Sequence, residues 1–461
     1  MHQALARALA RRTLGAMTRI PELEAVRQQS YWQATAPAMP DRRGRPLPDA
    51  ADVVVVGGGL TGLSAARRSA ELGASVVLLE GERLGWGGST RNGGMCHPGY
   101  KHSVAELVAE HGEAKGTALY RETVDAYEHV KGLCATSIGA DFVEGGHLVL
   151  AAVPSHAEAF GASAEALRRV DMPAHVVARQ DLRSEIGTDA YFGGLVVDRS
   201  AGLHPGKLVA GLVRLAEDAG ASLHEETRAL RIRPQADGRK VVETSRGALL
   251  AGDVIVATNG YTGSLTPSLR RRLLSIGSFI IVTDPLPADL AAELSPRGRM
   301  FFDTKNFLYY WRLTPDNRML FGGRASMWPS SILHTAEILQ RSMVRVHPQL
   351  AGTRIAYAWG GRVAFTYDRM VHAGRADGVT YAVGCCGSGV AIMPWLGTRI
   401  AEWVGGSTPP ELASLTFPLV PAPYEGRAWF LPIAGEYWKA KDRLALREAA
   451  KDAAGPGPNA G

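Results

Sequence analysis

A run of valines that ends in clustered glycines constrains the fold of this chain more than any other feature. Val53–Val56 form a continuous β-branched segment, and such a segment is typical of a strand buried on both faces of a parallel sheet. Small and apolar residues then recur at helical spacing, and a second apolar run, Val76–Leu79, follows them. Residues 52–80 are therefore predicted to form a strand, a helix and a second, parallel strand.

The glycines between the first strand and the helix predict a dinucleotide-binding turn. They have the spacing G-x-G-x-x-G and are Gly57, Gly59 and Gly62. The first permits a tight turn, the second lets backbone N–H groups approach a pyrophosphate, and the third allows close packing of helix on strand. The positive end of the helix dipole, at Leu60 and Thr61, favours phosphate charge. Glu80 ends the second strand, where a carboxylate accepts hydrogen bonds from ribose hydroxyls and argues against NADP by repelling its 2′-phosphate.

The segment Leu84–Gly94, LGWGGSTRNGG, favours FAD over a nicotinamide cofactor. It has too many glycines for a helix, and its small residues let an extended backbone lie along the rest of a long ligand. Ser89, Thr90 and Arg91 offer hydrogen-bond donors to that ligand. A nicotinamide dehydrogenase would not need such a loop directly after the ribose carboxylate.

The later chain predicts a second kind of sheet. Pro315-Asp316-Asn317 is a turn signal between two strand-like aromatic runs, and a hairpin of this kind is typical of an antiparallel sheet. A helix is predicted from Pro205 to Gly220, and GDVIVATNG is predicted to be a further strand that ends near Gly260. We therefore expect an α/β fold in which a parallel, Rossmann-like domain is interleaved with an α+β substrate domain built on an antiparallel sheet.

Several segments together resemble one family. The strings ADVVVVGGGLTGLSAA, GWGGSTRNGG, LYYWRLTPDNRMLFGGR and YAVGCCGSGVA are similar to those of FAD-dependent amine and amino-acid oxidases of the D-amino-acid oxidase superfamily. SYWQATAP at residues 30–37 and WFLPIAGEYWKAKDRL near the C-terminus resemble the γ-glutamylputrescine-oxidase-like branch in particular. The resemblance covers residues 28–447, and its motifs are far more specific for FAD than for a substrate.

These features together predict that two domains alternate along the chain. After a leader (1–27), the FAD-binding domain is expected to comprise residues 28–145, 200–268 and 359–410. The substrate domain is expected to comprise residues 146–199 and 269–358, and a C-terminal extension and tail (411–461) follow.

The resemblance also implies which residues hold the cofactor. FAD would lie extended, with its adenosine at the first strand and helix and its flavin ring between the domains. The implied contacts are Gly57, Gly59, Leu60, Thr61, Gly62, Glu80, Trp86, Gly87, Ser89, Thr90, Arg91, Asn92, Ala229, Ala257, Gly260, Gly384, Gly387, Ser388, Gly389 and Val390. Pro394 suits a first turn, so regular helix is expected only from Met393. The positive end of that helix would stabilise the negative charge that hydride transfer leaves near flavin N1.

The substrate side is predicted to be aromatic. Phe307, Tyr309 and Trp311 share one face of a predicted strand, and ordinary core packing is the simpler explanation of that face. Tyr309 and Tyr310 are catalytic candidates because they lie at the strand centre. Trp359 joins them because the resemblance places a substrate-facing group there, and Ser388 joins them because it stands where relatives commonly have His. Candidates for a substrate carboxylate are Arg312, Arg324 and Arg362, with surface or structural pairing as the alternative for the first two.

Some positions depart from the family. Ser388 stands where relatives commonly have His, and it keeps a donor. Ala391 stands where sarcosine-oxidase relatives use a Lys for an α-carboxylate, which favours an amine whose carboxylate, if any, is remote. The strand MLFGGRA lacks the Lys that aids reaction with O2 in some relatives. The segment WGGRVAFTYDR lacks a Cys or His for flavin attachment, so non-covalent FAD is expected, with Cys96 or His97 as the alternative.

The predicted function is oxidation of a primary or secondary amine to an imine by hydride transfer to flavin N5, with O2 as acceptor. A dehydrogenase that uses a quinone or a carrier protein is the first alternative, and an FAD-binding subunit without turnover is the second. His204 is predicted to cap a helix or fill the domain interface rather than to act in catalysis.

Charge and composition exclude other classes. A net charge of +6 and a pI of about 9.1 suggest a polyanion partner. Four of the six charges, however, lie in the acid-free residues 1–20, which are either a transit peptide or a disordered extension: Arg7, Arg11, Arg12 and Arg19. No nucleic acid partner is therefore expected. The uncharged stretch Gly378–Thr398 contains glycines and Pro394, which argues against a membrane span. Four cysteines indicate a reducing compartment, the cytoplasm, and residues 449–461 are expected to be a disordered tail.

Overall fold

The first sheet is built around the valine strand that the sequence predicts. The structure, a computed structural model, describes residues 20–328 and 330–454 of the chain. The parallel strands of this sheet are, in order, β19 (Val379–Val383), β12 (Gly247–Val256), β1 (Ala50–Val56), β2 (Val76–Leu79) and β9 (Ser222–His224). Antiparallel strands extend it: β10 (Ala229–Pro234), β11 (Lys240–Thr244) and β18 (His372–Ala376). The predicted parallel pair within residues 52–80 is confirmed.

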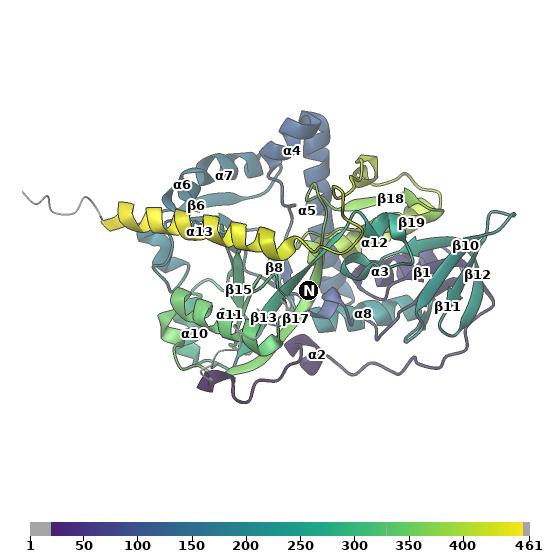
Figure 1. Cartoon of the computed structure of the whole chain (residues 1–461), viewed down its shortest axis with the longest axis horizontal. Helices are drawn as coiled ribbons and strands as arrows, with labels where there is room; N and C mark the ends of the chain where they lie inside the picture. Colours follow the sequence, from purple (N-terminus) through teal and green to yellow (C-terminus); the bar gives the residue numbers. More distant parts are fainter. Residues whose placement is uncertain (1–19, 329, 455–461) are drawn as a thin grey trace, which may run out of the picture.

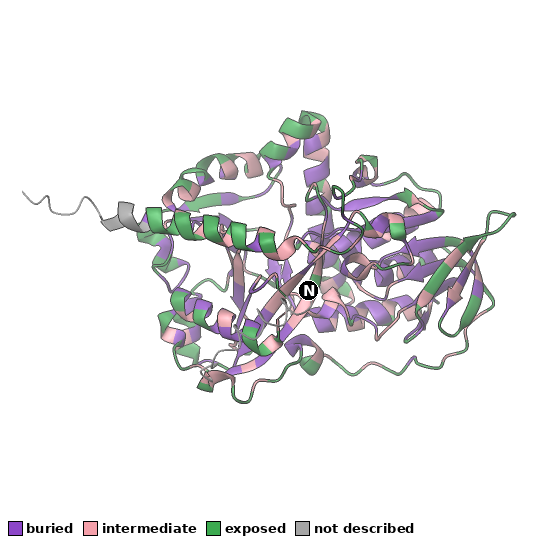
Figure 2. Ribbon diagram, in the orientation of Figure 1, coloured by how far each residue is buried: buried purple, intermediate pink, exposed green. Residues whose placement is uncertain are grey.

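Both faces of β1 are buried, as the unbroken valine run predicts. Val53 and Val55 pack in a core cluster with α3 (Leu60–Glu71), α8 (Pro205–Asp218) and α12 (Gly389–Val404). Val54 and Val56 pack in a different cluster, which includes residues of β11, β12 and β19. Figure 2 shows this part of the molecule as predominantly buried.

The helix α12 begins earlier than the sequence predicts. It starts at Gly389 rather than near Met393, so Pro394 lies inside it. Proline costs a helix one backbone hydrogen bond, but α12 packs against α3 and against α5 (Glu113–Thr136). A Cβ atom on Gly397 would lie 2.2 Å from the carbonyl oxygen of Thr61, so the two helices cross very closely. This tertiary packing outweighs the local preference.

The second sheet is antiparallel except where β14 pairs with β5 in parallel. Its order is β17 (Ile355–Phe365), β13 (Leu274–Thr283), β16 (Met319–Gly323), β15 (Tyr309–Leu313), β14 (Met300–Asp303), β5 (His147–Leu150), β7 (Gly194–Val197) and β6 (Ala174–Val177). The hairpin β15–β16 confirms the predicted turn, in which Asn317 adopts a left-handed φ of 56°. The helix α11 (Ile332–Val346) packs against this sheet.

The chain passes back and forth between the two sheets, which lie beside each other in Figure 1. A small third sheet joins the crossing segments and consists of β3 (Met95–Cys96), β8 (Ala201–Gly202) and β4 (Val143–Glu144). The α/β fold with an interleaved, mainly antiparallel substrate domain is confirmed. The remaining elements are η1 (Pro21–Leu23), α2 (Tyr31–Thr35), η2 (Gly88–Thr90), α4 (Val104–His111), α6 (Pro154–Glu158), α7 (Phe160–Arg168), η3 (Arg179–Ser184), η4 (Asn259–Tyr261), α9 (Pro267–Arg270), α10 (Ala288–Leu294), η5 (Pro348–Leu350), η6 (Glu411–Ser414) and α13 (Leu431–Ala454).

Residues 20–27 and 449–454 have more regular contacts than the sequence predicts for a leader and a tail. Arg27 forms a parallel bridge to Tyr357, so the expected leader already contacts the second sheet within residues 20–27. The expected tail is helical up to Ala454, because α13 continues from residue 431, and Asp442 of this helix accepts a hydrogen bond from the Phe307 N–H at 2.9 Å. Residues 1–19, with the arginine-rich leader, and residues 455–461 lie outside the described residues. None of the described helices combines the length and the apolar character needed to cross a membrane.

Candidate functional site

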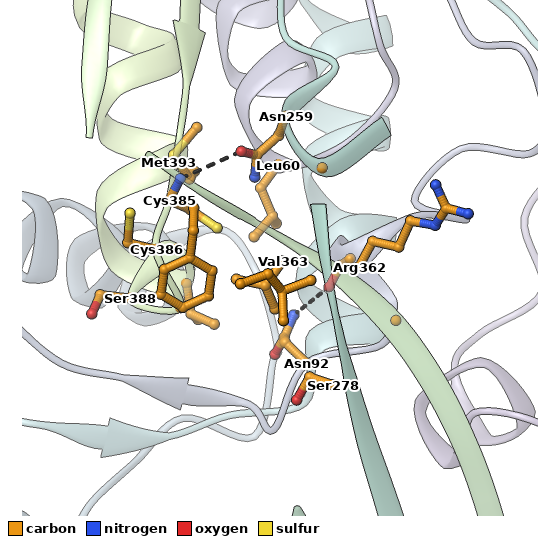
Figure 3. A pocket seen from close by; sticks show the side chains of 18 of the residues that line it. Leu60, Asn92, Asn259, Ser278, Arg362, Val363, Cys385, Cys386, Ser388 and Met393 are labelled. Carbon is orange, nitrogen blue, oxygen red and sulfur yellow. Dashed lines mark hydrogen bonds between the residues drawn. The ribbon is translucent and has the colours of Figure 1, made fainter. Parts of the chain in front are cut away.

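A long cavity lies where the two sheets meet. Its volume is about 1220 Å³, and its lining runs from the turn after β1, past the loop 86–93, to the loop 385–390 and strands of the second sheet. Ordinary small-molecule sites are about 300–1,000 Å³, so this cavity has room for a long ligand and a second, smaller one. Figure 3 shows its inner region, around which Asn92, Ser278, Val363 and Ser388 are arranged.

The glycine turn forms a narrow cradle at one end of the cavity. A Cβ atom at Gly57, whose φ is +112°, would lie 2.8 Å from the carbonyl oxygen of Ala257. One at Gly59 would lie 2.7 Å from Ser89 Oγ, and one at Gly62 would lie 1.8 Å from the carbonyl oxygen of Gly57. These three positions therefore accept only glycine without rearrangement, and the start of α3 lies open to an anion.

Glu80 lies at the cavity wall beside this cradle. Its carboxylate accepts hydrogen bonds from the N–H groups of Gly58 at 2.7 Å and Glu82 at 2.8 Å. Burial raises the pKa of Glu80 above its usual value. Ala229 lines the cavity nearby. The remaining hydrogen-bonding capacity of the carboxylate suits ribose hydroxyls, as the sequence predicts.

Residues behind the loop Leu84–Gly94 hold its backbone in place. Trp32 Nε1 donates to the carbonyl oxygen of Asn92 at 2.7 Å, and Trp359 Nε1 donates to that of Arg91 at 3.1 Å. The Arg312 guanidinium is buried and donates to the carbonyl oxygens of Gly93 and Leu203, at 3.0 and 2.6 Å. Neither Trp359 nor Arg312 is among the residues that line the cavity. The structure therefore does not support the catalytic role predicted for Trp359 or the substrate contact predicted for Arg312.

The side chains of the loop itself are arranged along the cavity. The guanidinium of Arg91 lies 4.2 Å from the centre of the Trp86 ring and donates to the carbonyl oxygen of Trp86. Ser89 Oγ accepts a hydrogen bond from the Leu60 N–H at 3.0 Å, so the loop is tied to the start of α3. Asn92 donates to the carbonyl oxygen of Ser89 at 2.8 Å. Gly87 also lines the cavity, whereas Thr90 is buried behind it.

The loop 384–390 forms the other end of the predicted cofactor site. Asn259 Oδ1 accepts hydrogen bonds from the N–H groups of Gly384 at 2.9 Å and Cys385 at 3.4 Å. Figure 3 shows the bond to Cys385. Cys386 and Gly387 adopt left-handed φ angles of 49° and 97°, which turns the chain sharply into α12. Ser388 is the N-cap residue of α12, and in the described part of the chain no side chain caps this helix. Its first N–H groups are therefore free to stabilise negative charge in the cavity.

Most of the predicted cofactor residues are brought together by this arrangement. Those that line the cavity are Gly57, Gly59, Leu60, Thr61, Glu80, Trp86, Gly87, Ser89, Arg91, Asn92, Ala229, Ala257, Gly260, Gly387, Ser388, Gly389 and Val390. Gly62, Thr90 and Gly384 lie behind the lining and support it. The glycine cradle, the ribose carboxylate and two helix N-termini fit the components of an FAD molecule, and their contacts with it stay a prediction.

The aromatic strand β15 separates the two tyrosine candidates. Tyr310 lines the cavity, where its hydroxyl lies 3.1 Å from Ser278 Oγ, and burial raises its pKa to about 12. Tyr309 lies on the opposite face, with its hydroxyl 2.8 Å from Ser342 Oγ and its ring against Phe321. Alternation along a strand places neighbours on opposite faces, so Tyr309 belongs to the core and is not a catalytic candidate.

Of the three predicted arginines, Arg324 lines the inner cavity with its side chain. It donates to the carbonyl oxygen of Asn306 at 3.3 Å, and its guanidinium lies 4.7 Å from the centre of the Phe365 ring. Arg362 also lines the cavity, but it is exposed and its side chain extends away from the labelled side chains in Figure 3. Its carbonyl oxygen would lie 2.9 Å from a Cβ atom on Gly260, so its backbone shapes the site more than its side chain does.

The sequence reasoning missed Lys101 and His147 and treated His97 only as a possible attachment point. All three line the cavity. The rings of His97, His147 and Phe302 form a cluster with centroid distances of 5.3–5.4 Å. Burial lowers the pKa of His97 to about 4 and that of His147 well below its usual value, so both imidazoles are neutral at pH 7. The sequence signal that could have placed His97 and Lys101 in the cavity is their position just after the cofactor loop.

The fold and site define an FAD-dependent oxidoreductase. The profile of the family DAO, described as "FAD dependent oxidoreductase", matches residues 52–403, and the chain belongs to this family. A probable oxidoreductase, OrdL, of Haemophilus influenzae is 32% identical over 395 residues, which cover 82% of this chain and 88% of that protein. γ-Glutamylputrescine oxidoreductase of Escherichia coli is 30% identical over 416 residues, 86% of this chain and 93% of that protein. The predicted resemblance to this branch is confirmed.

Solved structures share the fold at lower sequence identity. Glycine oxidase of Geobacillus kaustophilus has a TM-score of 0.69 and 20% identity, with 80% of this chain and 99% of that chain covered. Iminodiacetate oxidase of Chelativorans has a TM-score of 0.62 and 21% identity, with 77% and 96% covered. The family, which is described as FAD-dependent, confirms FAD as the cofactor.

Proposed function

We propose that this flavoprotein oxidises a primary or secondary amine to an imine, which water then hydrolyses, and that O2 accepts the electrons. The observation that carries the proposal is the inner cavity wall, where neutral imidazoles, aromatic rings and two cations meet beside the predicted flavin site. The names of γ-glutamylputrescine oxidoreductase, glycine oxidase and iminodiacetate oxidase all specify compounds that contain an amine nitrogen.

The wall favours the reactive form of an amine. FAD, when bound, supplies an acceptor for the hydride of the carbon next to nitrogen, and the nitrogen must be neutral so that its lone pair assists. An alkylammonium with a pKa of about 10 pays about 4 kcal/mol to lose its proton at pH 7. Burial can lower such a pKa by about 3–5 units, and nearby positive charge lowers it further. Lys101 and Arg324 supply that charge.

His97 is suited to orient the amine rather than to hold its proton. Its Nδ1 lies 2.8 Å from the carbonyl oxygen of Pro98, and because a carbonyl only accepts, Nδ1 carries the hydrogen. Nε2 is therefore the acceptor nitrogen of the neutral ring. With a pKa of about 4, the ring accepts a hydrogen bond from an amine N–H but does not retain a proton at pH 7.

The free N–H groups at the start of α12 complete the proposed chemistry. They lie beside Ser388, which lines the cavity. Positive charge at this helix end stabilises the negative charge that two-electron reduction leaves in the site. We also propose that FAD is held without a covalent bond. Of the two alternative attachment points, Cys96 is fully buried in β3 and does not line the cavity, whereas His97 lines it and is assigned here to the amine.

An anaerobic titration tests the proposal. The purified yellow protein is mixed with alkylamines and N-substituted amino acids without oxygen, and bleaching of the flavin absorbance is the expected result. Oxygen is then admitted, and stoichiometric hydrogen peroxide with return of the colour is expected. Failure of every amine to bleach the flavin contradicts amine oxidation and favours the flavin-binding subunit.

The electron acceptor is tested in the same experiment. Bleaching that persists in air without peroxide, and that a soluble quinone reverses, would identify a dehydrogenase and contradict the oxidase assignment. Yellow colour that stays in an acid precipitate would contradict non-covalent binding.

A further inference from the structure

One side of the C-terminal helix α13 carries an exposed apolar stripe. Ile433, Tyr437 and Leu444 are 67%, 62% and 58% exposed, and Ala440 between them is also exposed. Their spacing of four, three and four residues places all four side chains on one side of the helix. Figure 2 shows most of α13 as exposed. Large apolar side chains that gather on one exposed face indicate an interaction surface.

The opposite side of α13 packs against the protein. Asp442 accepts a hydrogen bond from the Asn306 N–H at 3.1 Å. A Cβ atom on Gly435 would lie 2.7 Å from Cγ of Met327, and Ala449 is buried. At about 100° per residue, these positions lie roughly 180° from the apolar stripe. The apolar stripe therefore faces away from the rest of its own chain.

The apolar stripe is complementary to a reversed copy of itself. In two helices that run antiparallel about a twofold axis, Ile433 would pack against Leu444 of the second copy, and Tyr437 against Ala440 of the second copy. A large side chain would then face a small one in the two central layers, and two aliphatic side chains would meet in each outer layer, which favours interdigitated packing. A parallel pair would instead stack each residue on its own counterpart, including Ala440 on Ala440.

Charged side chains beside the apolar stripe also favour the antiparallel pairing. Glu436 and Arg443 are exposed and lie on the same edge of the stripe. Reversal of the second helix brings Glu436 of one copy beside Arg443 of the second copy, and the twofold axis repeats this pair. Arg447 takes the position that follows Leu444 in the stripe. A parallel pair would place it against Arg447 of the second copy, where like charges repel.

We propose that α13 joins two copies of this chain into a homodimer by pairing antiparallel with the same helix of the second copy. This inference does not depend on the proposed function. The stripe from Ile433 to Leu444 is about 17 Å long, at 1.5 Å per residue. It is short for a stable interface, so a Kd in the micromolar range is expected. A lipid surface fits less well, because interfacial helices are rich in Lys and Arg, whereas Glu436 and Glu448 border this stripe.

Sedimentation velocity of the FAD-loaded full chain at about 1–200 µM measures the Kd of the dimer. The wild type is expected to change from monomer to dimer over this range. Leu444→Asp is expected to stay monomeric, because its carboxylate would be buried against Ile433 of the second copy. FAD content and melting temperature show that each variant is folded. A wild type that stays monomeric at every concentration would overturn the proposal.

An exchange of charges tests the antiparallel pairing itself. Glu436→Arg and Arg443→Glu each bring like charges together twice in the dimer, so each is expected to raise the Kd about three- to tenfold. The double variant restores opposite charges, and its Kd is expected to return to within about twofold of the wild type. Glu436 also pairs with Lys439 of its own chain at 3.0 Å. Glu165→Arg is the matched control, since it breaks the exposed pair with Arg169 at the end of α7 and should leave the Kd unchanged.

Three results would contradict the proposal. A dimer that persists in Leu444→Asp would place the interface on another surface. A Kd that rises further in the double variant than in either single variant would exclude the antiparallel pairing. A wild type that floats with phosphatidylglycerol vesicles, loses this binding in Leu444→Asp and never dimerises would assign the apolar stripe to a lipid surface.

Discussion

His204 makes the stability of the cofactor site depend on pH. It is the N-cap residue of α8, and its Nδ1 accepts a hydrogen bond from the Lys207 N–H at 3.1 Å, which confirms the predicted helix cap. Its Nε2 lies 2.9 Å from Thr35 Oγ1, and its ring packs against Trp32, which in turn holds the Asn92 carbonyl of the cofactor loop. Protonation places a hydrogen on Nδ1, so the cap is lost.

The magnitude follows from the pKa of His204, which burial lowers from 6.5 to about 4. Since the folded protein binds this proton less readily than the unfolded chain, the stabilisation is complete above pH 6.5 and is lost as pH falls toward 4. Over the roughly 1.5 pH units between pH 6.5 and pH 5, the free energy of unfolding falls by about 2 kcal/mol. Thr35, the hydrogen-bond partner of the ring, is exposed, so solvent reduces the effect. We therefore expect the free energy of unfolding to fall by about 1–2 kcal/mol.

Urea unfolding of the wild type and His204→Asn at pH 7, 6 and 5 measures this effect, with flavin release read by fluorescence. Asparagine is a strong N-cap that does not titrate, so the variant should match the wild type within about 1 kcal/mol at pH 7 and lose about 1–2 kcal/mol less by pH 5. Other buried histidines, such as His97 and His347, titrate in both proteins, so their contributions to the pH dependence cancel when the two proteins are compared. An identical pH dependence in the two proteins would refute the reasoning.

Three further predictions concern the cavity. Gly62→Ala places a Cβ atom against the Gly57 carbonyl oxygen and is expected to abolish FAD retention on gel filtration. Glu80→Gln keeps the shape but removes the charged acceptor, so FAD affinity measured by fluorescence quenching should fall about tenfold or more. Tyr309→Phe should lower stability by about 1 kcal/mol with the rate of flavin reduction unchanged, whereas Tyr310→Phe should change that rate; the reverse pattern in stopped flow would contradict the assigned faces.

Much of the fold could be predicted because its determinants are local. The valine run, the glycine spacing and the turn at Pro315–Asn317 each specify their element within a few residues, and all were confirmed. The start of α12 was predicted wrongly because the cost of Pro394 is local while the packing that offsets it comes from α3 and α5.

The inner cavity was only partly predictable, because burial and partners depend on distant segments. Arg312 and Arg324 follow similar strand patterns, yet one binds backbone carbonyls and the other lines the cavity. The sequence showed that Tyr309 and Tyr310 lie on opposite faces of the strand, but it did not show which face lines the cavity. Lys101 carried no motif, so only the three-dimensional structure brings it to Arg324.

Three side chains behind the cofactor loop, those of Trp32, Arg312 and Trp359, link the loop to the second sheet and the N-terminal segment. The loop Leu84–Gly94 is rich in glycine, and each ordered glycine costs roughly 0.5–1 kcal/mol more in entropy than alanine would. Hydrogen bonds from Trp32, Arg312 and Trp359 to its backbone offset that cost, and they come from the N-terminal segment and from β15 and β17 of the second sheet. The loop therefore becomes rigid only when both sheets are assembled. We infer that FAD binding depends on residues far from the glycine turn. Substitutions of Trp32, Arg312 or Trp359 are expected to reduce cofactor retention before they change substrate choice.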